Sequence, residues 1–527
     1  MQKSIIGIIF LSFLFLSIES RSQVAKQDSL ALVALFNATD GDNWTFWRGG
    51  WTGGSPVTNW GGVTVEEIPG QGYRVTGLTL WRNNLKGELP PEMGDLTYLR
   101  HIHFNENQLT GSIPETFVNL KYLEDISITD NNFNGELPGF LYQLPNLEII
   151  GFGMNNFYGT LPESWSALQN LRDLYLQDNN LSGGLPASWG ELKNLEKLGL
   201  NLNNFTGTLP PEWGNLEKLQ EFTLWENELS GTIPEEFAGM KSLNFLEISG
   251  NNFEGPLPQS FIQLENLREL YMGHNNWGEE FPTVLTEMTG LVSLFYNRTG
   301  LRTVPEEITR MVNLRQLSLN HNDLGGEFPM HLTEMKNLEV LYLWNTRLEG
   351  EIPDELFELK NLQSLALGDN NFTGSVPEAI ASLTNLREFL VDNNQLSSFP
   401  DLEHHQFNQI PEFSLQGNYF HFEDLQHIQQ HGFTITSMEQ RPLPAFNITE
   451  KEKAAGEKVK LHANARGNIS SFHWYQNGEL IGQTSEPHFE LQSITSEHNG
   501  LWHVEFHSED FNNLTLQSNE LRITITD

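Results

Sequence analysis

Leucine recurs at a constant interval of 24 residues through the middle of this 527-residue chain. These leucines are Leu99, Leu123, Leu147, Leu171, Leu195, Leu219, Leu243, Leu267 and Leu291. Each interval carries the same template, L-x-x-L-x-L-x-x-N-x-L-x-G-x-[IL]-P-x-x-[LFW]-x-x-[LM]. A fixed period with one template indicates an array of similar coils. Because no single coil can bury its own apolar face, successive coils must stack and share a core.

The template also predicts the conformation of each coil. Its L-x-L pair alternates with a period of two, which predicts a short strand whose leucines point inward. Asparagine at the ninth position, such as Asn179 or Asn227, is expected to turn the chain and to satisfy backbone groups with its side-chain amide. Glycine at the thirteenth position permits a tight conformation. The proline that follows favours a return path of short 3₁₀ or extended segments.

We count about fourteen repeats between residues 75 and 407. The pattern predicts a leucine-rich repeat solenoid, with a parallel β-sheet on its concave face and 3₁₀ or extended segments on its convex side. The tenth repeat departs from the template, because it is 23 residues long and has Thr299 in place of the asparagine. Thr346 makes the same replacement in the twelfth repeat. A last partial coil leads into residues 408–438, which we interpret as a C-terminal cap.

The chain before the first repeat does not follow the template. We interpret residues 23–74 as a cap over the apolar end of the coil array, which every stacked array needs. Asp28 is expected to cap an amphipathic helix that buries Leu30, Val33 and Phe36 on one face. A tryptophan-rich segment follows this predicted helix.

The same region carries a family resemblance. The segments "ALVALFNATDGDNW", "NWGGVTV" and "RVTGLTLWRNNL" between Asp28 and Leu80 resemble the N-terminal cap of plant-type leucine-rich repeat proteins. That family usually has C-x-W-x-G-V-x-C, where residues 58–65 of this chain read T-N-W-G-G-V-T-V. Both cysteine positions are therefore replaced. The closing segment after the last coil resembles that of secreted bacterial leucine-rich repeat proteins.

The sequence changes character after a proline-marked linker at residues 439–447. Residues 448–527 contain short alternating segments, among them "KVKLHANA", "SFHWYQNG" and "LWHVEFH", separated by turn residues. Such a succession of short strands predicts a small all-β sandwich.

This C-terminal segment resembles an immunoglobulin-like domain in its details. Trp474 in "HWYQNGELI" stands where that family has the tryptophan of its third strand. Residues 498–504, "HNGLWHV", match the family's D-x-G-x-Y-x-C segment, with Trp502 in the tyrosine position. Ala463 and Val504 stand at the two cysteine positions, so the resemblance implies a sandwich in which apolar packing replaces the disulfide.

Composition excludes several functions. The formal net charge is −38, and this field would repel nucleic acid. The chain has no cysteine, so it can form no disulfide, thiolate nucleophile or cysteine-ligated zinc site. The sequence contains no nucleophile elbow, phosphate-binding loop or dinucleotide fingerprint.

The first residues predict export. Residues 1–22 combine Lys3 with an apolar run and small residues, as a cleaved signal peptide does. This run is too short to predict a membrane span, and we expect no transmembrane segment. Two modules whose families usually carry disulfides both lack them, which favours a bacterial exported protein, secreted or held at the cell surface.

Outward strand positions of the later repeats hold a candidate binding surface. Aromatic and charged residues occupy them on adjacent or near-adjacent coils, which predicts a patch about 25 Å long. The predicted ligand-binding residues are Trp225, Phe245, Glu247, Glu269, Tyr271, Phe295, Arg298, Tyr342 and Trp344. By contrast, Trp165, Trp189 and Trp213 occupy an apolar template position and are expected in the convex-side core.

Catalysis and metal binding have weaker sequence support. Glu221, Glu247 and Glu269 come from neighbouring coils and could form a carboxylate pair of the glycosidase type, but a solvated acidic face explains them better. Histidines at 404, 405, 427 and 431 are expected to be surface residues of the terminal cap. We therefore predict no catalytic residue, metal or cofactor.

The sequence thus predicts an exported, non-enzymatic recognition or adhesion protein that binds a protein ligand on the concave face. The alternative is an extracellular glycan-binding protein, because aromatic faces flanked by acids also suit sugar rings. A carboxylate-dependent glycan hydrolase ranks last. The sequence leaves the oligomeric state open.

Overall fold

A computed structural model describes residues 24–51, 54–402, 412–430, 439–443 and 450–526. The chain divides into two compact units, Met1–Trp277 and Gly278–Asp527, which we call the first unit and the second unit. The predicted signal peptide, residues 1–22, lies outside the described residues. No helix in the described ranges combines the length and the apolar character needed to cross a bilayer.

The first unit begins with helix α2 (Lys26–Ala38), and here two predictions were wrong. Asp28 lies inside the helix, and its buried carboxylate forms an ion pair with Arg74 (2.7 Å). The helix buries Leu32 and Leu35, whereas Leu30 is 59% exposed. The reason for both errors is that the helix packs through the face that contains Asp28, where Arg74 offsets the cost of burying the charge.

Short segments connect this helix to the coils. They are η1 (Gly41–Asn43), η2 (Val57–Asn59), β1 (Val63–Ile68) and β2 (Gly72–Thr79). Strands β1 and β2 form an antiparallel hairpin, and β2 continues as the first strand of the parallel sheet.

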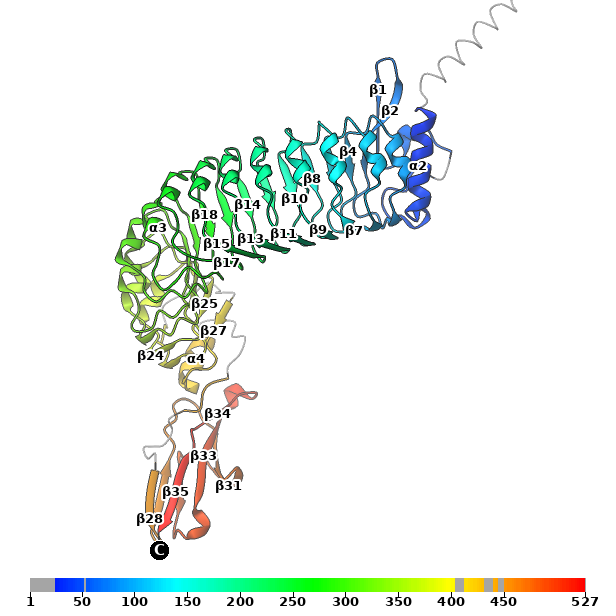
Figure 1. The fold of residues 1–527 in the computed structure, drawn as a ribbon. Helices are drawn as coiled ribbons and strands as arrows, with labels where there is room; N and C mark the ends of the chain where they lie inside the picture. Colours follow the sequence, from blue (N-terminus) through cyan, green and yellow to red (C-terminus); the bar gives the residue numbers. More distant parts are fainter. Residues whose placement is uncertain (1–23, 52–53, 403–411, 431–438, 444–449, 527) are drawn as a thin grey trace, which may run out of the picture. The chain divides into compact units, whose positions relative to one another are not determined.

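The coils of the first unit place one three-residue strand each side by side in a parallel sheet (Figure 1). These strands are β4 (His101–His103), β6 (Asp125–Ser127), β8 (Ile149–Gly151), β10 (Asp173–Tyr175), β12 (Lys197–Gly199), β14 (Glu221–Thr223), β16 (Phe245–Glu247) and β18 (Glu269–Tyr271). Pairing is in register, so that equivalent template positions face each other on neighbouring strands. The predicted parallel sheet is confirmed.

The coils that begin with β2 to β16 each return through a 3₁₀ helix, as predicted, and each also carries a second strand that was not predicted. The helices are η3 (Pro91–Asp95), η4 (Glu115–Asn119), η5 (Gly139–Gln143), η6 (Glu163–Ala167), η7 (Ala187–Glu191), η8 (Pro211–Asn215), η9 (Glu235–Gly239) and η10 (Gln259–Gln263). The second sheet contains β3 (Lys86–Glu88), β5 (Gln108–Gly111), β7 (Asn132–Glu136), β9 (Asn156–Gly159), β11 (Asn180–Gly183), β13 (Asn204–Gly207), β15 (Glu228–Gly231) and β17 (Asn252–Phe253).

Two ladders hold neighbouring coils together. The side chain of Asn179 accepts a hydrogen bond from Phe157 N (2.9 Å) and donates to the carbonyls of Phe152 (3.0 Å) and Leu176 (3.1 Å). This pattern repeats from coil to coil and confirms the predicted role of the asparagine. A ladder of indole rings, Trp165, Trp189 and Trp213, lies fully buried with centroids 6.2 Å apart, which confirms their predicted place in the core.

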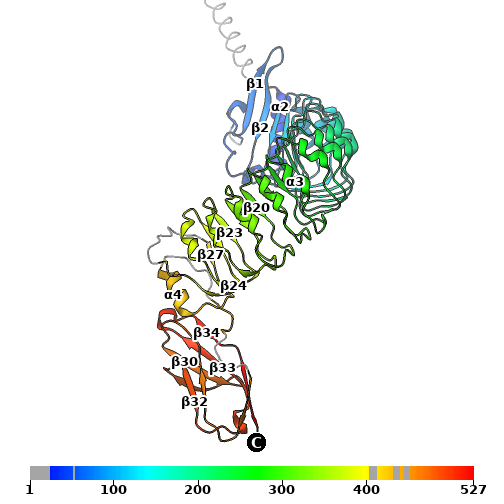
Figure 2. The same cartoon turned by 90° about the vertical axis from the view of Figure 1, so that its left-hand side faces the viewer.

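The second unit continues with further coils, several of which are visible in Figure 2. Its first sheet contains β19 (Ser293–Phe295), β20 (Gln316–Ser318), β21 (Val340–Tyr342), β23 (Ser364–Ala366), β25 (Glu388–Leu390) and β27 (Glu412–Ser414). Its second sheet contains β22 (Glu349–Glu351), β24 (Asn371–Ser375) and β26 (Gln395–Ser398). The return segments are α3 (Thr283–Glu287), η11 (Glu306–Arg310), η12 (Met330–Glu334), η13 (Asp354–Glu358) and η14 (Glu378–Ser382), and α4 (Phe422–Gln430) follows the last coil.

The end of the chain forms two β-sheets. One contains β28 (Glu450–Ala454), β30 (Ser471–Gln476), β31 (Glu479–Thr484), β33 (Gly500–His507), β34 (Thr515–Gln517) and β35 (Leu521–Thr526), and the other pairs β29 (Val459–His462) with β32 (His488–Leu491). Two 3₁₀ turns, η15 (Ser496–His498) and η16 (Glu509–Phe511), lie between strands. Trp474 of β30 is buried and stacks at 5.7 Å on Phe489 of β32, so this tryptophan joins the two sheets.

Candidate functional site

Several short strands of the first sheet present two side chains outward. In β16 the middle residue Leu246 is buried, whereas Phe245 and Glu247 on either side of it are partly exposed. The same burial pattern recurs in β10, β14 and β18. Successive strand residues alternate between faces, so the third and fifth template positions form two rows along the sheet.

Five of the nine predicted binding residues lie in the first unit, and we call them the first patch: Trp225, Phe245, Glu247, Glu269 and Tyr271. In the parallel register, Phe245 faces Glu269 and Glu247 faces Tyr271 on the next strand. The rings of Phe245 and Tyr271 meet edge to face, with centroids 5.3 Å apart. The Tyr271 hydroxyl donates a hydrogen bond to Glu269 Oε2 (2.9 Å). The structure therefore brings four of these residues into a cluster on two adjacent strands.

Glu247 is the unusual member of this cluster. Among the described residues, its carboxyl group has no hydrogen-bond or ion-pair partner, although its neighbours bury much of it. Burial disfavours the charged form and raises the pKa of Glu247 from 4.5 to about 7. This residue stands opposite Tyr271 in the strand register, and its charged form would gain stability from any cationic group that approached it.

The other four predicted residues lie in the second unit, and we call them the second patch: Phe295, Arg298, Tyr342 and Trp344. Ser318 stands between Phe295 and Tyr342 in the strand register, so these two rings belong to strands that are not adjacent. The rings of His321 and Trp344 contact each other with centroids 3.9 Å apart.

Sequence reasoning missed one polar cluster in the second unit. The Tyr342 hydroxyl donates to Glu388 Oε2 (3.1 Å), and Ser364 forms hydrogen bonds with both Tyr342 and Glu388. Burial raises the pKa of Glu388, with a further contribution from Glu412. Tyr342, Ser364 and Glu388 come from β21, β23 and β25, and a comparison of the third and fifth template positions could have found them.

The eighth template position has an unexpected backbone conformation. Glu226 and Arg298 adopt φ values of 53° and 51°, and non-glycine residues in most other coils share this left-handed conformation. It costs about 1–2 kcal/mol for an ordinary side chain. Asn227, which follows Glu226, forms several hydrogen bonds with neighbouring backbone that stabilise its turn. Thr299 follows Arg298 instead, and its N–H and hydroxyl group both donate to Asn322 Oδ1. As a result, Arg298 is held exposed just beyond its strand.

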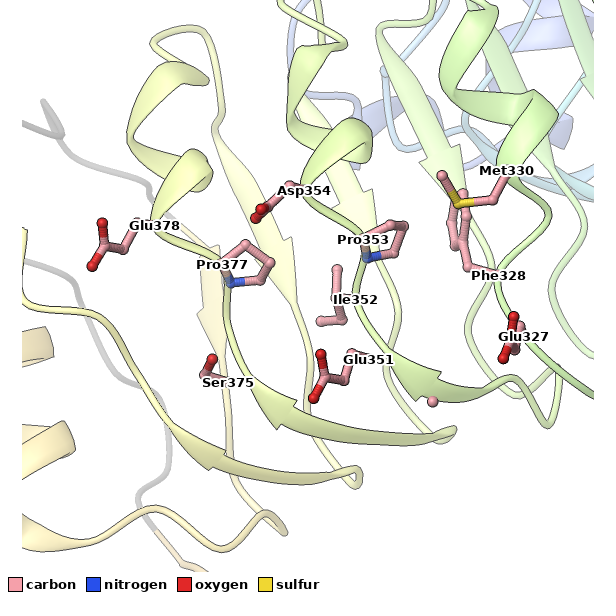
Figure 3. Close-up of a pocket in the computed structure, with 11 residues that line it drawn as sticks. Glu327, Phe328, Met330, Glu351, Ile352, Pro353, Asp354, Ser375, Pro377 and Glu378 are labelled. Carbon is pink, nitrogen blue, oxygen red and sulfur yellow. The ribbon is translucent and has the colours of Figure 1, made fainter.

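The second unit also contains a hollow of about 810 Å³ that includes none of the predicted residues (Figure 3). Segments just before η12, η13 and η14 line it, away from the strands of the first sheet. Its walls combine apolar groups such as Phe328 and Ile352 with four carboxylates. These are Glu327, Glu351, Asp354 and Glu378.

Metal-ligating groups are sparse. Histidines 404, 405 and 431 lie outside the described residues, and His427 is partly buried in α4. One group of three potential metal ligands occurs within the described ranges, at His473, Glu505 and His507 in the C-terminal sheet.

Comparisons with known proteins agree with the coil architecture. Leucine rich repeat family models match residues 193–253 and 336–396, and shorter models of the same description match 98–120, 170–192 and 313–335. A leucine-rich repeat protein of Leptospira interrogans is 31% identical, with a TM-score of 0.59 over 67% of this chain and 88% of that one.

Two further structures contain a partner named with them. The crystal structure of PEPR1-AtPEP1 is 27% identical, with a TM-score of 0.63 over 82% of this chain and 63% of that one. The plant peptide hormone receptor RGFR1 in complex with RGF2 is 28% identical, with a TM-score of 0.57 over 68% of this chain and 64% of that one. Two curated relatives from Arabidopsis thaliana match over only 5% and 18% of their lengths. The repeated coil, the asparagine ladder and these similarities show that the chain belongs to the leucine-rich repeat family, with repeats of the plant receptor-ectodomain type.

Proposed function

We propose that this protein is an exported, non-enzymatic recognition protein that binds an extended peptide segment of another protein across the first patch. The observation that carries the proposal is the Phe245–Tyr271 ring contact beside a half-buried Glu247 that has no partner in the part of the chain that the structure describes. Partly exposed aromatic clusters beside a desolvated charge are typical of interaction hot spots. The plant peptide hormone receptor among the similar structures supports a peptide as the ligand.

The chemistry of the first patch favours a ligand with an apolar side chain next to a basic one. The apolar group would contact Phe245 and Tyr271, while a lysine or arginine would approach Glu247 and shift that carboxyl toward its charged form. Glu269 already accepts the Tyr271 hydroxyl and would hold that ring in place. The overall charge of −38 would also attract a basic partner from a distance.

The second patch is proposed as a separate contact surface. Trp344 and Tyr342 offer apolar contacts, while exposed Arg298 would pair with an acidic group of the ligand. In this proposal the first patch selects for a basic residue and the second patch for an acidic one.

The remaining parts of the proposal concern organisation and location. We propose a signal peptide at 1–22, an N-terminal cap at 23–74, repeats at 75–407, a C-terminal cap at 408–438 and a linker at 439–447. An immunoglobulin-like domain would occupy 448–527, and the buried Trp474 between two sheets supports it. A bacterial origin is supported by the similarity to the protein of Leptospira interrogans.

Selection of peptides from a phage-displayed random library against the full chain tests the proposal. We expect enriched sequences that combine an aromatic or aliphatic residue with lysine or arginine. The Trp225→Ala/Tyr271→Ala variant should bind the selected peptides at least tenfold more weakly, since central aromatic contacts contribute about 2 kcal/mol or more. Fluorescence anisotropy of labelled peptides measures this change.

Tyr158→Ala is the matched control, because Tyr158 is 53% exposed on β9 of the other sheet. It should leave peptide affinity unchanged. Equal peptide affinity in the wild type and the double variant would refute the first patch as the site. Retarded migration in affinity electrophoresis with a polysaccharide, lost in the same variant, would favour a glycan ligand instead.

A further inference from the structure

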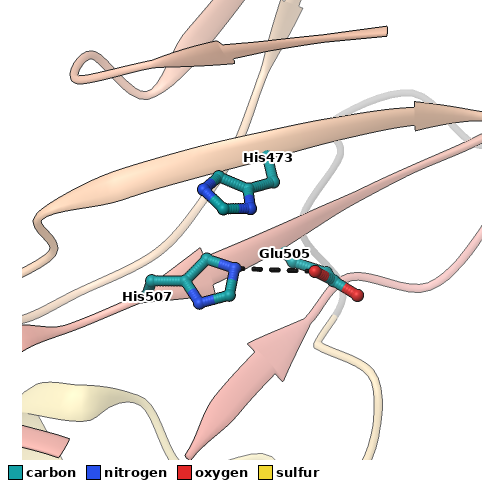
Figure 4. Close-up of side chains that lie close together, drawn as sticks. All are labelled: His473, Glu505 and His507. Atoms are coloured by element: carbon teal, nitrogen blue, oxygen red, sulfur yellow. Dashed lines mark ion pairs between the residues drawn. The ribbon is translucent and has the colours of Figure 1, made fainter. Parts of the chain in front are cut away.

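One face of the six-stranded C-terminal sheet carries histidines on two neighbouring antiparallel strands. His473 on β30 lies directly opposite Glu505 on β33, and His507 lies two residues further along β33. Because strand residues alternate between faces, these three share one face, while Trp474 and Phe506 next to them are buried on the other. Figure 4 shows the three side chains close together.

We propose that His473, Glu505 and His507 bind a divalent transition-metal ion, with Zn²⁺ as the fitting ion. One potential ligand atom from each residue lies within 4.8 Å of the other two. The Nε2 atom of His507 lies 3.5 Å from Oε2 of Glu505. Two ligands of a tetrahedral zinc ion, each about 2.1 Å from the metal, are about 3.4 Å apart. This pair therefore already stands at the spacing of two zinc ligands.

The hydrogen bonds around the cluster also point to a missing partner. Nε2 of His507 is buried, and its 3.5 Å ion-pair contact with Glu505, marked in Figure 4, is not accompanied by any hydrogen bond among the described residues. Buried polar atoms are nearly always satisfied, and an exception calls for a bound water or ion. A metal ion between His507, Glu505 and His473 would satisfy this nitrogen.

Neighbouring groups orient the ligands as outer partners do in metal sites. The Tyr475 hydroxyl donates to Glu505 Oε2 (2.9 Å), and Ser471 Oγ lies 3.3 Å from Nε2 of His473. Tyr475 is itself held by stacking on His503, with ring centroids 4.7 Å apart. Such outer contacts hold a ligating side chain in its orientation beforehand, so it loses less conformational entropy when it binds the metal.

The two imidazole rings of the cluster face each other, with centroids 4.1 Å apart. They come from the neighbouring strands β30 and β33, so both present their ring nitrogens on the same face of the sheet.

The ligand set determines the class of metal. Two imidazoles and one carboxylate favour zinc over calcium or magnesium, which prefer oxygen ligands. Three protein ligands leave the fourth position of a tetrahedral zinc ion to water. The ion would link β30 to β33 through their side chains.

Isothermal titration calorimetry of the full, untagged chain with Zn²⁺ alone tests the site. We expect Glu505→Gln and His473→Gln each to lose one equivalent of bound zinc, because each removes a ligand. Tyr475→Phe should keep that equivalent but bind it about tenfold more weakly, since it removes only an outer partner. Near-ultraviolet circular dichroism, to which Trp474 and Trp502 contribute along with the rest of the chain's 13 tryptophans, establishes that the variants are folded.

His488→Gln is the matched control, because His462 and His488 form another cross-strand histidine pair in the same domain, with ring centroids 5.8 Å apart. This variant should bind zinc as the wild type does. Equal stoichiometry and affinity in the wild type and in Glu505→Gln would overturn the proposal. Addition of Co²⁺ to the wild-type chain gives a test that needs no variant: intense visible bands of a tetrahedral site are expected, and their absence would also overturn it.

Discussion

The two units use the same coil but complete its asparagine ladder differently. In the first unit, Asn227 accepts from Phe205 N and donates to the carbonyls of Leu200 and Leu224. In the second unit, Thr346 occupies the equivalent position and has no amide to donate. There Asn370 of the next coil accepts from Thr346 N (3.0 Å) and lies 3.0 Å from its hydroxyl. The ladder thus tolerates the loss of one asparagine when the asparagine of the next coil forms hydrogen bonds with the residue at that position.

The end of the first unit shows another adjustment. Asn275 donates to the carbonyl of Ile248, 27 residues before it, as the ladder asparagines of earlier coils do. The carbonyl of Met272 is the equivalent acceptor for the ninth position of the next repeat, where Thr299 has replaced asparagine. In the structure, the indole nitrogen of Trp277 donates to Met272 O (2.7 Å). This contact gives Trp277 a local structural role.

The outward faces of the two units differ in whether their partly buried carboxyl groups are hydrogen-bonded. Glu388 of the second unit is hydrogen-bonded by Tyr342 and Ser364 within the protein. Glu247 of the first unit has no such partner among the described residues. A hydrogen-bonded network favours rigidity, whereas an unpartnered buried carboxyl leaves binding energy for a ligand. The comparison therefore favours the first patch as the principal contact.

Asn227→Ala should have the largest effect on this comparison. It removes the acceptor of the buried Phe205 N and two donated bonds, and we expect a loss of about 2–3 kcal/mol in unfolding free energy. The carbonyls of Leu200 and Leu224 keep a second donor, from Asn203 and Asn251, which limits the loss. Urea unfolding followed by tryptophan fluorescence measures it. If Asn227→Ala lost less unfolding free energy than Thr346→Val, the asparagine ladder would not be what stabilises the regular coils.

Glu247→Gln should have an intermediate effect that depends on pH. The folded pKa of about 7 exceeds the ordinary 4.5, so the folded state binds more protons between these values and its stability falls as the pH rises through them. The substitution should remove this loss and stabilise the protein by about 1 kcal/mol at pH 8, after allowance for solvent screening. Urea midpoints at pH 5 and pH 8 measure the difference. Glu228→Gln, at an exposed position, is the control. If the stability of the two variants changed with pH in the same way, the raised pKa of Glu247 would be contradicted.

Thr346→Val should have the smallest effect. It removes the hydroxyl that donates to the carbonyl of Leu343 (2.6 Å), but that carbonyl still receives the amide of Asn370 (2.8 Å). No buried group is left without a partner, so we expect a loss of about 0.5–1 kcal/mol. The same urea experiment measures it. A loss above 2 kcal/mol would mean that the hydroxyl, and not Asn370, sustains this part of the ladder.

Much of the fold was predictable because the repeat imposes the same local problem on every coil. The strand, the amide of Asn179 and the buried position of Trp189 all follow from spacing within one template. The second sheet was missed because its strands carry no alternating apolar pattern and depend on pairing with the next coil. The outward positions of the predicted binding residues were also predictable, but their partners were not.

By itself, the sequence determined the coil, its stacking and the rows in which outward side chains stand, since these depend on a period of 24 residues and on local backbone preference. Tertiary structure alone decided that Asp28 pairs with Arg74 and that His473 meets Glu505 and His507. It also decided that Glu388 is hydrogen-bonded, whereas Glu247 has no partner within the described ranges. Those outcomes depend on contacts between side chains far apart in the chain, and on which of them exclude water. A one-dimensional pattern carries no information about either.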